Sequence, residues 1–536
     1  MYTKFLGILI GVSVCFTPIA AQNYFYFVQF KFKSNTTESL SNPSSFLSSR
    51  AIARRAYFNI PVDSTDMPLN QNYVNQVASQ VSRVHSRSKW MNGVTVVVTD
   101  SLHIHQLRAF PFVERVEYTG RTSGMQHARK KVKTESTIYN YGTAETQLNM
   151  LGLDYLHNKG YTGKNIHVAV LDAGFTNVNT NVGFDSLRLQ GRLLGTKDFT
   201  EPVPNIYASD SHGANVLSIM AGNIPNQYLG AAPHASYWLL RTEYGPTEYK
   251  CETDFWVSGL EFADSVGVDV VNSSLGYTTF DDPVLNFSYA HMNGTFSRAS
   301  RAATMAAQKG ILVCNSAGND GNKAWKYIGV PADANGIIAV GACTSTKDPS
   351  VFTSFGPTSD FRAKPDLSAM GSSTAFINTA GNLSFGSGTS YASPLIAGAM
   401  ACFLQYAKAN YSAITIAKLI EYVQKSAHLY AAPTSQLGVG VPNFELASSN
   451  LTTRTLPKPD DALNYQVIVS KNNISIQSNK SAKRVFTVFN SAGVTVINTI
   501  GHEKLTSIST SGLARGIYVL HISEKHFSNI YKLLIE

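Results

Sequence analysis

The chain has 536 residues, of which 44% are hydrophobic and 15% are charged. This composition supplies enough apolar material for several folded domains and excludes global disorder, a coiled coil and a collagen-like fibre. The net charge of +9 raises the alternative of binding to nucleic acid or an anionic surface, which depends on where the basic residues lie.

The first residues predict a secretory signal peptide. An apolar run at residues 5–16 follows a lysine and precedes two alanines, so residues 1–21 are expected to be removed. The run is shorter than the roughly 20 residues of a membrane-spanning helix. No later stretch of the sequence is apolar enough to span a membrane. Cys15 leaves a lipoprotein signal as an alternative, which is disfavoured because Val14 precedes it in place of a small residue.

Residues 22–130 predict a small α+β unit. The alternating strand YFYFVQFKFK precedes an arginine-rich helical stretch, SSRAIARRAYF, and the strand GVTVVVTD follows. The basic segment HARKKVKT closes the unit and is expected to be an exposed, cleavable linker.

From residue 141 to residue 449, apolar strands alternate with helices. The expected strands are IHVAVLD, GVDVVNSS, GILVCNSAG and GIIAVGA, and the expected helices include NVLSIMAG, FWVSGLEFADSVG, FSRASRAATMAAQKG and SYASPLIAGAMACFLQYAKA. Continuous apolar strands separated by helices predict an α/β fold, a doubly wound, mostly parallel sheet with helices on both faces.

Beyond this region, residues 450–462 are polar and contain prolines, which predicts a linker. Residues 463–536 hold short strands separated by Asn, Ser and Gly, which is typical of a small β-sandwich. Four cysteines remain after the signal peptide, at 251, 314, 343 and 402. Their spacing does not resemble a zinc site, and buried free thiols and disulfides remain equally open.

Three side chains of the α/β region form a candidate catalytic set. Asp172 ends a buried strand, His212 lies where a helix is expected to begin, and Ser390 precedes a long apolar helix. Each alone is commonly structural, as a cap or a satisfied core residue. Together, at one edge of one sheet, they supply an orienting acid, a base and a nucleophile.

A fourth side chain fits the same chemistry. Asn319 lies in the Gly-containing turn of CNSAGND, after another strand, where its amide could donate to a developing oxyanion. An ordinary Asx turn is the alternative for this segment taken alone.

In these blocks the sequence resembles the subtilisin-like serine peptidases, or subtilases. VLDAGF, SHGANVLSIMAG and GTSYASPLIAG match the Asp, His and Ser blocks of that family, in its order. The resemblance implies peptide-bond hydrolysis of protein or peptide substrates, and substrate binding as an added strand along Ser274, Leu275 and Gly276. Asn215 and Tyr391 depart from the common residues beside the triad, which leaves the triad intact and bears on substrate preference.

The resemblance implies no catalytic cofactor and no catalytic metal. It leaves room for structural calcium, although the usual calcium loops are not readable and residues 288–295 offer only a weak candidate.

The flanking regions extend the resemblance. Residues 22–130 resemble a subtilase propeptide, an intramolecular inhibitor removed by a cut between about residues 128 and 146. Residues 463–536, with LARGIYVLHI and YKLLIE, resemble the sorting domain of type IX secretion cargo, which implies a partner in the secretion machinery and a secreted or surface-attached product. A generic β accessory module is the alternative.

The basic residues lie mostly in the expected propeptide. Residues 22–130 carry a net charge of +7, whereas residues 131–536 carry +1. The nucleic-acid alternative therefore loses its support. A different alternative, a cell-surface binding protein on an inactive subtilase scaffold, is motivated by Asn215 and the sorting tail, and labelling with a serine-directed fluorophosphonate distinguishes the two.

Overall fold

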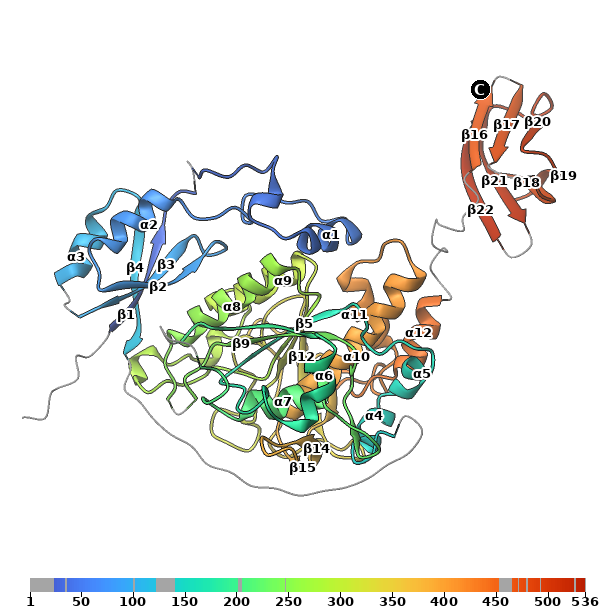
Figure 1. Cartoon of the computed structure of the whole chain (residues 1–536). Coiled ribbons are helices and arrows are strands. Elements are labelled where there is room, and N and C mark those ends of the chain that lie inside the picture. Colours follow the sequence, from blue (N-terminus) through green and yellow to red (C-terminus); the bar gives the residue numbers. More distant parts are fainter. Residues whose placement is uncertain are drawn as a thin grey trace, which may run out of the picture. The chain divides into compact units, whose positions relative to one another are not determined.

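The computed structural model describes residues 24–33, 36–99, 102–121, 140–200, 205–245, 247–452, 465–470, 472–478, 481–491, 493–524 and 527–535 (Figure 1). The predicted signal peptide and the segment HARKKVKT lie outside the described residues, as does most of the predicted linker. The described residues form two compact units. One runs to Tyr406 and includes Ile414–Leu451, and the other holds Ala407–Ala413 and the residues from Thr452 onward.

The first unit begins with an α+β domain, as predicted. Its four strands form an antiparallel sheet in the order β2-β3-β1-β4, which packs around a valine-rich core. Every residue of β3 is buried, so this strand lies at the centre of the domain. The elements are β1 (Tyr24–Phe30), η1 (Pro43–Ser45), α1 (Ser49–Tyr57), α2 (Gln71–Ala78), β2 (Arg83–Ser88), β3 (Gly93–Val98), α3 (Leu102–Ala109) and β4 (Val113–Arg121).

The α/β domain contains a seven-stranded sheet in the order β13-β12-β11-β10-β5-β9-β6, in which all neighbours are parallel. This arrangement confirms the predicted fold class. The strands are β5 (His167–Asp172), β6 (Leu193–Asp198), β9 (Ser236–Arg241), β10 (Val270–Ser273), β11 (Leu312–Ser316), β12 (Ile338–Cys343) and β13 (Leu367–Met370).

The direction of strand progression reverses between β5 and β10. From β10 onward the chain adds strands on one side, whereas β9 and β6 lie on the other. In such sheets, the loops at the carboxyl ends beside the reversal open into a crevice. The loops that follow β5, β10 and β11 therefore converge at one edge.

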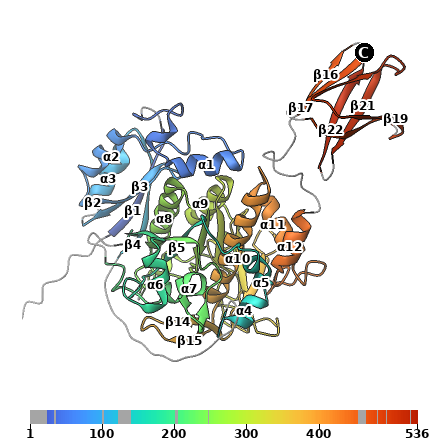
Figure 2. The ribbon, with the colours of Figure 1, turned by 45° about the vertical axis from the view of Figure 1, so that its right-hand side comes forward.

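Helices cover both faces of the sheet (Figures 1 and 2). Helices α8 (Glu252–Val266) and α9 (Arg298–Gln308) lie beside the N-terminal domain, and α7 (His212–Ala221) and α10 (Thr389–Asn410) lie across the sheet from them. Of the β5 side chains, Ala169 and Leu171 face α8. Shorter elements complete the domain: α4 (Glu145–Asn149), α5 (Leu153–Asn158), η2 (Val182–Phe184), α6 (Asp185–Leu189), β7 (Asn223–Ile224), β8 (Tyr228–Leu229), η3 (Pro283–Leu285), η4 (Tyr289–His291), β14 (Thr374–Ile377), β15 (Leu383–Gly386), α11 (Ile416–Lys425) and α12 (Phe444–Thr452).

The C-terminal domain consists of two antiparallel sheets, β16-β17-β20 and β19-β18-β21-β22. Alternating side chains of both sheets form one apolar core, which includes Ile474, Phe486 and Leu520. This is the predicted β-sandwich. Its strands are β16 (Tyr465–Ser470), β17 (Asn473–Ser478), β18 (Arg484–Asn490), β19 (Thr495–Gly501), β20 (Leu505–Ser509), β21 (Gly516–Glu524) and β22 (Phe527–Ile535).

The cysteines of the described residues are free and buried. The sequence left buried free thiols and disulfides open, and the structure shows buried free thiols. In the described parts of the chain, no helix combines the length and the apolar character that crossing a bilayer requires.

Candidate active site

Asp172 and His212 form a hydrogen-bonded pair at the carboxyl edge of the sheet. Asp172 is the last residue of β5 and is fully buried. Its Oδ1 lies 2.8 Å from Nδ1 of His212 and also accepts the main-chain N–H of Ala173 at 2.8 Å. The imidazole is therefore oriented by a carboxylate that has little freedom of its own.

His212 is placed by the start of helix α7. The main-chain N–H of His212 donates to Oδ1 of Asp210 at 2.7 Å, which satisfies one of the free amides at this helix end. Gly213 is required next to it, because a Cβ there would lie 2.4 Å from the Gly174 carbonyl oxygen. The helix can thus approach the end of β5 closely enough for the two side chains to bond.

The electrostatics of His212 reflect its carboxylate neighbours. Burial lowers the pKa of the imidazole, but the charge and the hydrogen bond of Asp172 raise it, with a further contribution from Asp210. The net effect is a raised pKa. A base that is more readily protonated than an ordinary histidine accepts a proton from a hydroxyl more easily.

Ser390 lies in the first turn of helix α10 and is 9% exposed. Its hydroxyl donates to the carbonyl oxygen of Ser274 at 3.2 Å, and the Ser274 hydroxyl donates to the Ser390 carbonyl at 2.9 Å. Within the described residues, no hydrogen bond joins the Ser390 hydroxyl to His212. The structure therefore places the nucleophile candidate against the predicted substrate strand.

The side chain of Asn319 is fixed by Thr389, the neighbour of Ser390. Oδ1 of Asn319 accepts the main-chain N–H of Thr389 at 2.8 Å and the Thr389 hydroxyl at 3.0 Å. Two donors at one atom identify it as the oxygen of the amide. The Nδ2 group is thus the part of Asn319 that remains to donate to a ligand beside Ser390.

Residues Ser274, Leu275 and Gly276 follow β10 and form one wall of the site. The Leu275 carbonyl accepts from the side chains of Asn315 at 3.0 Å and Ser316 at 3.3 Å, which fixes the segment against β11. Gly276 is exposed, and a Cβ there would have only the Val330 carbonyl oxygen, at 3.8 Å, within 4 Å. Its main chain is accessible for pairing with an extended peptide.

A cavity of about 290 Å³ opens between His212 and this wall, and its lining carries four carboxyl groups. Burial and the neighbouring carboxylates raise the pKa of Glu243 and Glu252 well above the ordinary value, and burial and Asp281 raise that of Glu248 to about 7. The carboxyl groups belong to Asp210, Glu243, Glu248 and Glu252.

Among the described residues, those of the cavity included, no cluster of three or more His, Cys, Asp or Glu side chains is arranged to hold a metal ion. The weak calcium candidate at residues 288–295 holds a short 3-10 helix, in which the Ser288 N–H donates to His291.

The structure thus joins Asp172 to His212, places Asn319 beside Thr389 and Ser390, and brings Ser390 to Ser274. Three features of the site could not be identified from the sequence motifs: the bonds of Thr389 to Asn319, the role of Asp210 and the glutamates of the cavity. The local sequence EYGPTEYKCE carried a signal for the last of these, because three glutamates occur within ten residues.

Comparisons with known proteins match all three domains. Residues 163–440 match the subtilase family (peptidase S8). Residues 25–136 match the peptidase S8 propeptide domain of Bacteroidota, and residues 470–536 match the secretion system C-terminal sorting domain.

The chain is similar to several curated proteins. Subtilisin NAT of Bacillus subtilis subsp. natto is 31% identical over 46% of this chain and 58% of its own length, so the match spans less than two thirds of that relative. Subtilisin of Bacillus pumilus is 28% identical over 55% of this chain and 94% of its own length. Among solved structures, MycP1 from the ESX-1 type VII secretion system is 19% identical, with a TM-score of 0.45, over 60% of this chain and 90% of that chain.

Proposed function

Because this chain belongs to the subtilase family, we propose that it is a serine endopeptidase that hydrolyses peptide bonds through an acyl-enzyme intermediate. The observation that carries the proposal is the 2.8 Å bond between buried Asp172 and His212 at the sheet edge where Ser390 and Asn319 also lie. An oriented base, a hydroxyl and an amide donor at one edge are the parts that acyl transfer needs.

In the proposed reaction, His212 takes the hydroxyl proton of Ser390 as the Ser390 Oγ attacks the scissile carbonyl carbon. His212 then gives this proton to the leaving amine. Asp172 holds the imidazole tautomer and stabilises the imidazolium. For this step the Ser390 hydroxyl exchanges its bond to the Ser274 carbonyl for one to His212. The Asn319 amide and the main-chain N–H of Ser390 bind the oxyanion.

The substrate is proposed to be a protein or peptide that lies as an added strand along Ser274, Leu275 and Gly276. The exposed main chain of Gly276 supports this role, because strand addition uses main-chain donors and acceptors. A subtilase needs no cofactor for this chemistry, and any calcium would be structural.

The chain is proposed to be a zymogen, with boundaries as expected from the sequence. Residues 1–21 are the signal, 22–130 the inhibitory propeptide, 141–449 the peptidase domain, 450–462 a linker and 463–536 the sorting domain. The match of residues 25–136 to a propeptide domain supports this division. The sorting domain marks the protein as secreted or attached to the cell surface, and its proposed partner is the type IX secretion machinery.

The test is the full-length Ser390→Ala chain compared with the wild type. We expect the variant to lose turnover of a peptide substrate, labelling by a fluorophosphonate and self-cleavage near residue 130. A Ser390→Ala protein that is secreted and matures by itself at the normal rate would refute the assignment. A correctly folded wild-type chain that takes no label would instead favour the inactive-scaffold alternative.

A further inference from the structure

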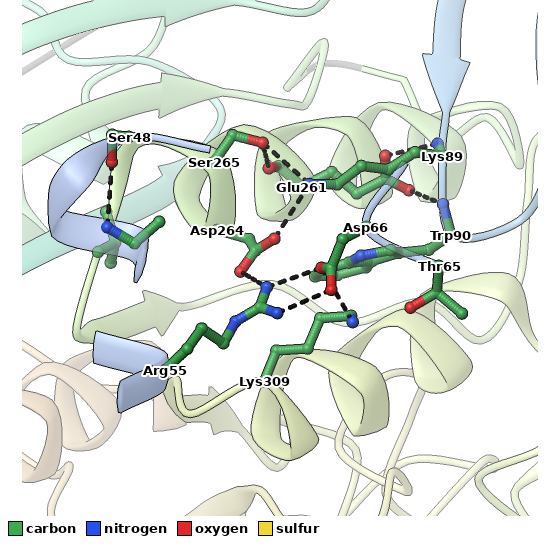
Figure 3. Close-up of polar contacts among 12 residues, drawn as sticks. Ser48, Arg55, Thr65, Asp66, Lys89, Trp90, Glu261, Asp264, Ser265 and Lys309 are labelled. Carbon is green, nitrogen blue, oxygen red and sulfur yellow. Dashed lines mark hydrogen bonds and ion pairs between the residues drawn. The ribbon is translucent and has the colours of Figure 1, made fainter. Parts of the chain in front are cut away.

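Residues 48–66 of the propeptide, here called the arginine arm, lie apart from the propeptide's own core. The apolar core of the four-stranded sheet contains no residue of this segment. The arm instead contacts the peptidase domain where helices α8 and α9 end, and Figure 3 shows the contact. Its helix α1 begins there, with the Ser48 N–H donating to the Ser265 carbonyl at 3.0 Å.

The arm caps the ends of two peptidase helices. Arg54 donates to the carbonyl oxygens of Val268 at 2.6 Å and Lys309 at 3.3 Å, and Arg50 donates to that of Gly267 at 3.0 Å. The last carbonyls of a helix have no partner within the helix, and the helix dipole favours cations there. The arm therefore supplies two guanidinium groups where α8 and α9 need them.

Ion pairs reinforce the caps in a buried network. Asp264 of α8 is fully buried and binds three cations of the propeptide, which lower its pKa although burial raises it. A second carboxylate, Asp66 of the arm, accepts two hydrogen bonds from Arg55, at 2.8 and 2.9 Å, and pairs with Lys309 of the peptidase at 3.0 Å. The three cations on Asp264 are Arg54, Arg55 (2.8 Å) and Lys89 (3.0 Å).

The propeptide sheet has a contact of its own with the peptidase. Glu261 of α8 accepts the Ser88 hydroxyl and the main-chain N–H groups of Lys89 and Trp90, at 2.5, 2.8 and 3.0 Å. Trp90 and Met91 pack into the apolar core beneath α8. Two contacts thus join the same two domains. The sheet contact combines this apolar packing with ion pairs of Glu117 in β4 to Arg298 and Lys250 of the peptidase, whereas the contact of the arm is mainly ionic.

We propose that the arginine arm is a second anchor, separable from the sheet contact, that sets how long the cut propeptide stays bound to the peptidase. The proposal rests on the proposed function, because only a chain that cuts itself forms this complex. Buried charge pairs across an interface act mainly on the dissociation rate, and truncation of one partner commonly changes it by more than tenfold. The mature sequence is unchanged by substitutions in the arm, so its activity serves as an internal control.

The test uses the full-length chain carrying Arg54→Met, with Arg87→Met as the matched control. Arg87 is an exposed propeptide residue, and within the described part of the chain its side chain bonds only to Gln71 of the propeptide. After self-cleavage, dissociation of the propeptide is followed by native mass spectrometry, and the lag before peptide hydrolysis is timed. We expect Arg54→Met to speed dissociation about 30-fold or more and to shorten the lag, with unchanged final activity.

Dissociation of Arg54→Met within threefold of Arg87→Met would overturn the proposal. Absence of activity in every chain, wild type included, would instead contradict the proposed function. If Arg54→Met does not accumulate, hydrogen exchange of the wild-type cut complex decides: protection of residues 49–57 as strong as that of β3 supports the second anchor, and free exchange of 49–57 beside a protected β3 overturns it.

Discussion

Replacement of Asn319 by alanine tests whether its amide stabilises the oxyanion. The Oδ1 atom is held by two donors of Thr389, at 2.8 and 3.0 Å, so the Nδ2 group is pre-positioned and loses little freedom when it donates. Loss of one such donor costs about 2.7–4 kcal/mol of transition-state stabilisation. We therefore expect kcat to fall roughly 100- to 1000-fold, with KM nearly unchanged.

Substitutions of Thr389 should lower kcat through the same amide, but by a smaller factor. The isosteric change Thr389→Val removes the hydroxyl bond to Asn319 but keeps the main-chain N–H bond, and one such hydrogen bond contributes about 0.5–1.5 kcal/mol net. A fall in kcat of about 2- to 12-fold is expected, and Thr389→Ser, which keeps the hydroxyl, should stay close to the wild type.

The assay is steady-state hydrolysis of a chromogenic peptide by the matured variants, with circular dichroism as a check on folding. The order expected for kcat is wild type, Thr389→Ser, Thr389→Val and then Asn319→Ala. Two results would refute the reasoning: a kcat for Asn319→Ala within fivefold of the wild type, or a loss expressed only in KM, because a donor that binds substrate and transition state equally changes KM alone.

Three further predictions concern His212, His85 and Gly267. Asp172 raises the pKa of His212, and the reaction needs the neutral imidazole, so activity should fall as the pH drops through that raised pKa. The variant Asp172→Asn should lower kcat about 10⁴-fold and move the acidic limb of the pH–rate profile to lower pH. Burial lowers the pKa of His85 to about 4 although its ring bonds to the Phe199 carbonyl, so the unfolded chain binds this proton first. The melting temperature of the uncut Ser390→Ala chain should then drop from pH 6.5 to 4, and the drop should be smaller in the same chain with His85→Gln. Gly267→Ala should destabilise the uncut chain more than Gly160→Ala. Both glycines have a φ near +82°, but only at Gly267 would a Cβ lie 2.7 Å from the Ala51 nitrogen. Thermal unfolding of the two variants measures the difference.

Four strands of the parallel sheet could be predicted from the sequence because each contains a continuous apolar run. Strands β5, β10, β11 and β12 are buried along most or all of their length, and their runs of apolar residues indicated a parallel sheet directly. Three strands of the sheet were not predicted. Strand β6 is the half-exposed edge strand with the sequence LLGTKD, β9 buries only part of SYWLLR, and β13, although buried, is only four residues long.

The site was predictable as a set of residue types but not as a set of bonds. Asp172, His212, Asn319 and Ser390 could be identified because each follows a strand or begins a helix at one sheet edge. The bond that orients Asn319 joins residues 70 positions apart, and the Ser390–Ser274 pair spans 116 positions. Such contacts depend on how the loops pack, which local sequence patterns do not specify.

The charge of the chain is informative only once its partners are known. The net charge of +9 raised the alternative of a polyanionic partner. In the structure, four cations of the basic segment 22–130 instead pair with the carboxylates Asp264 and Asp269 of the peptidase, namely Arg50, Arg54, Arg55 and Lys89. The basic segment, which is proposed to separate from a nearly neutral remainder after the cut, is thus matched to buried carboxylates of the peptidase domain. The composition shows only that cationic side chains are in excess, whereas the fold shows that the carboxylates that pair with them belong to the same chain.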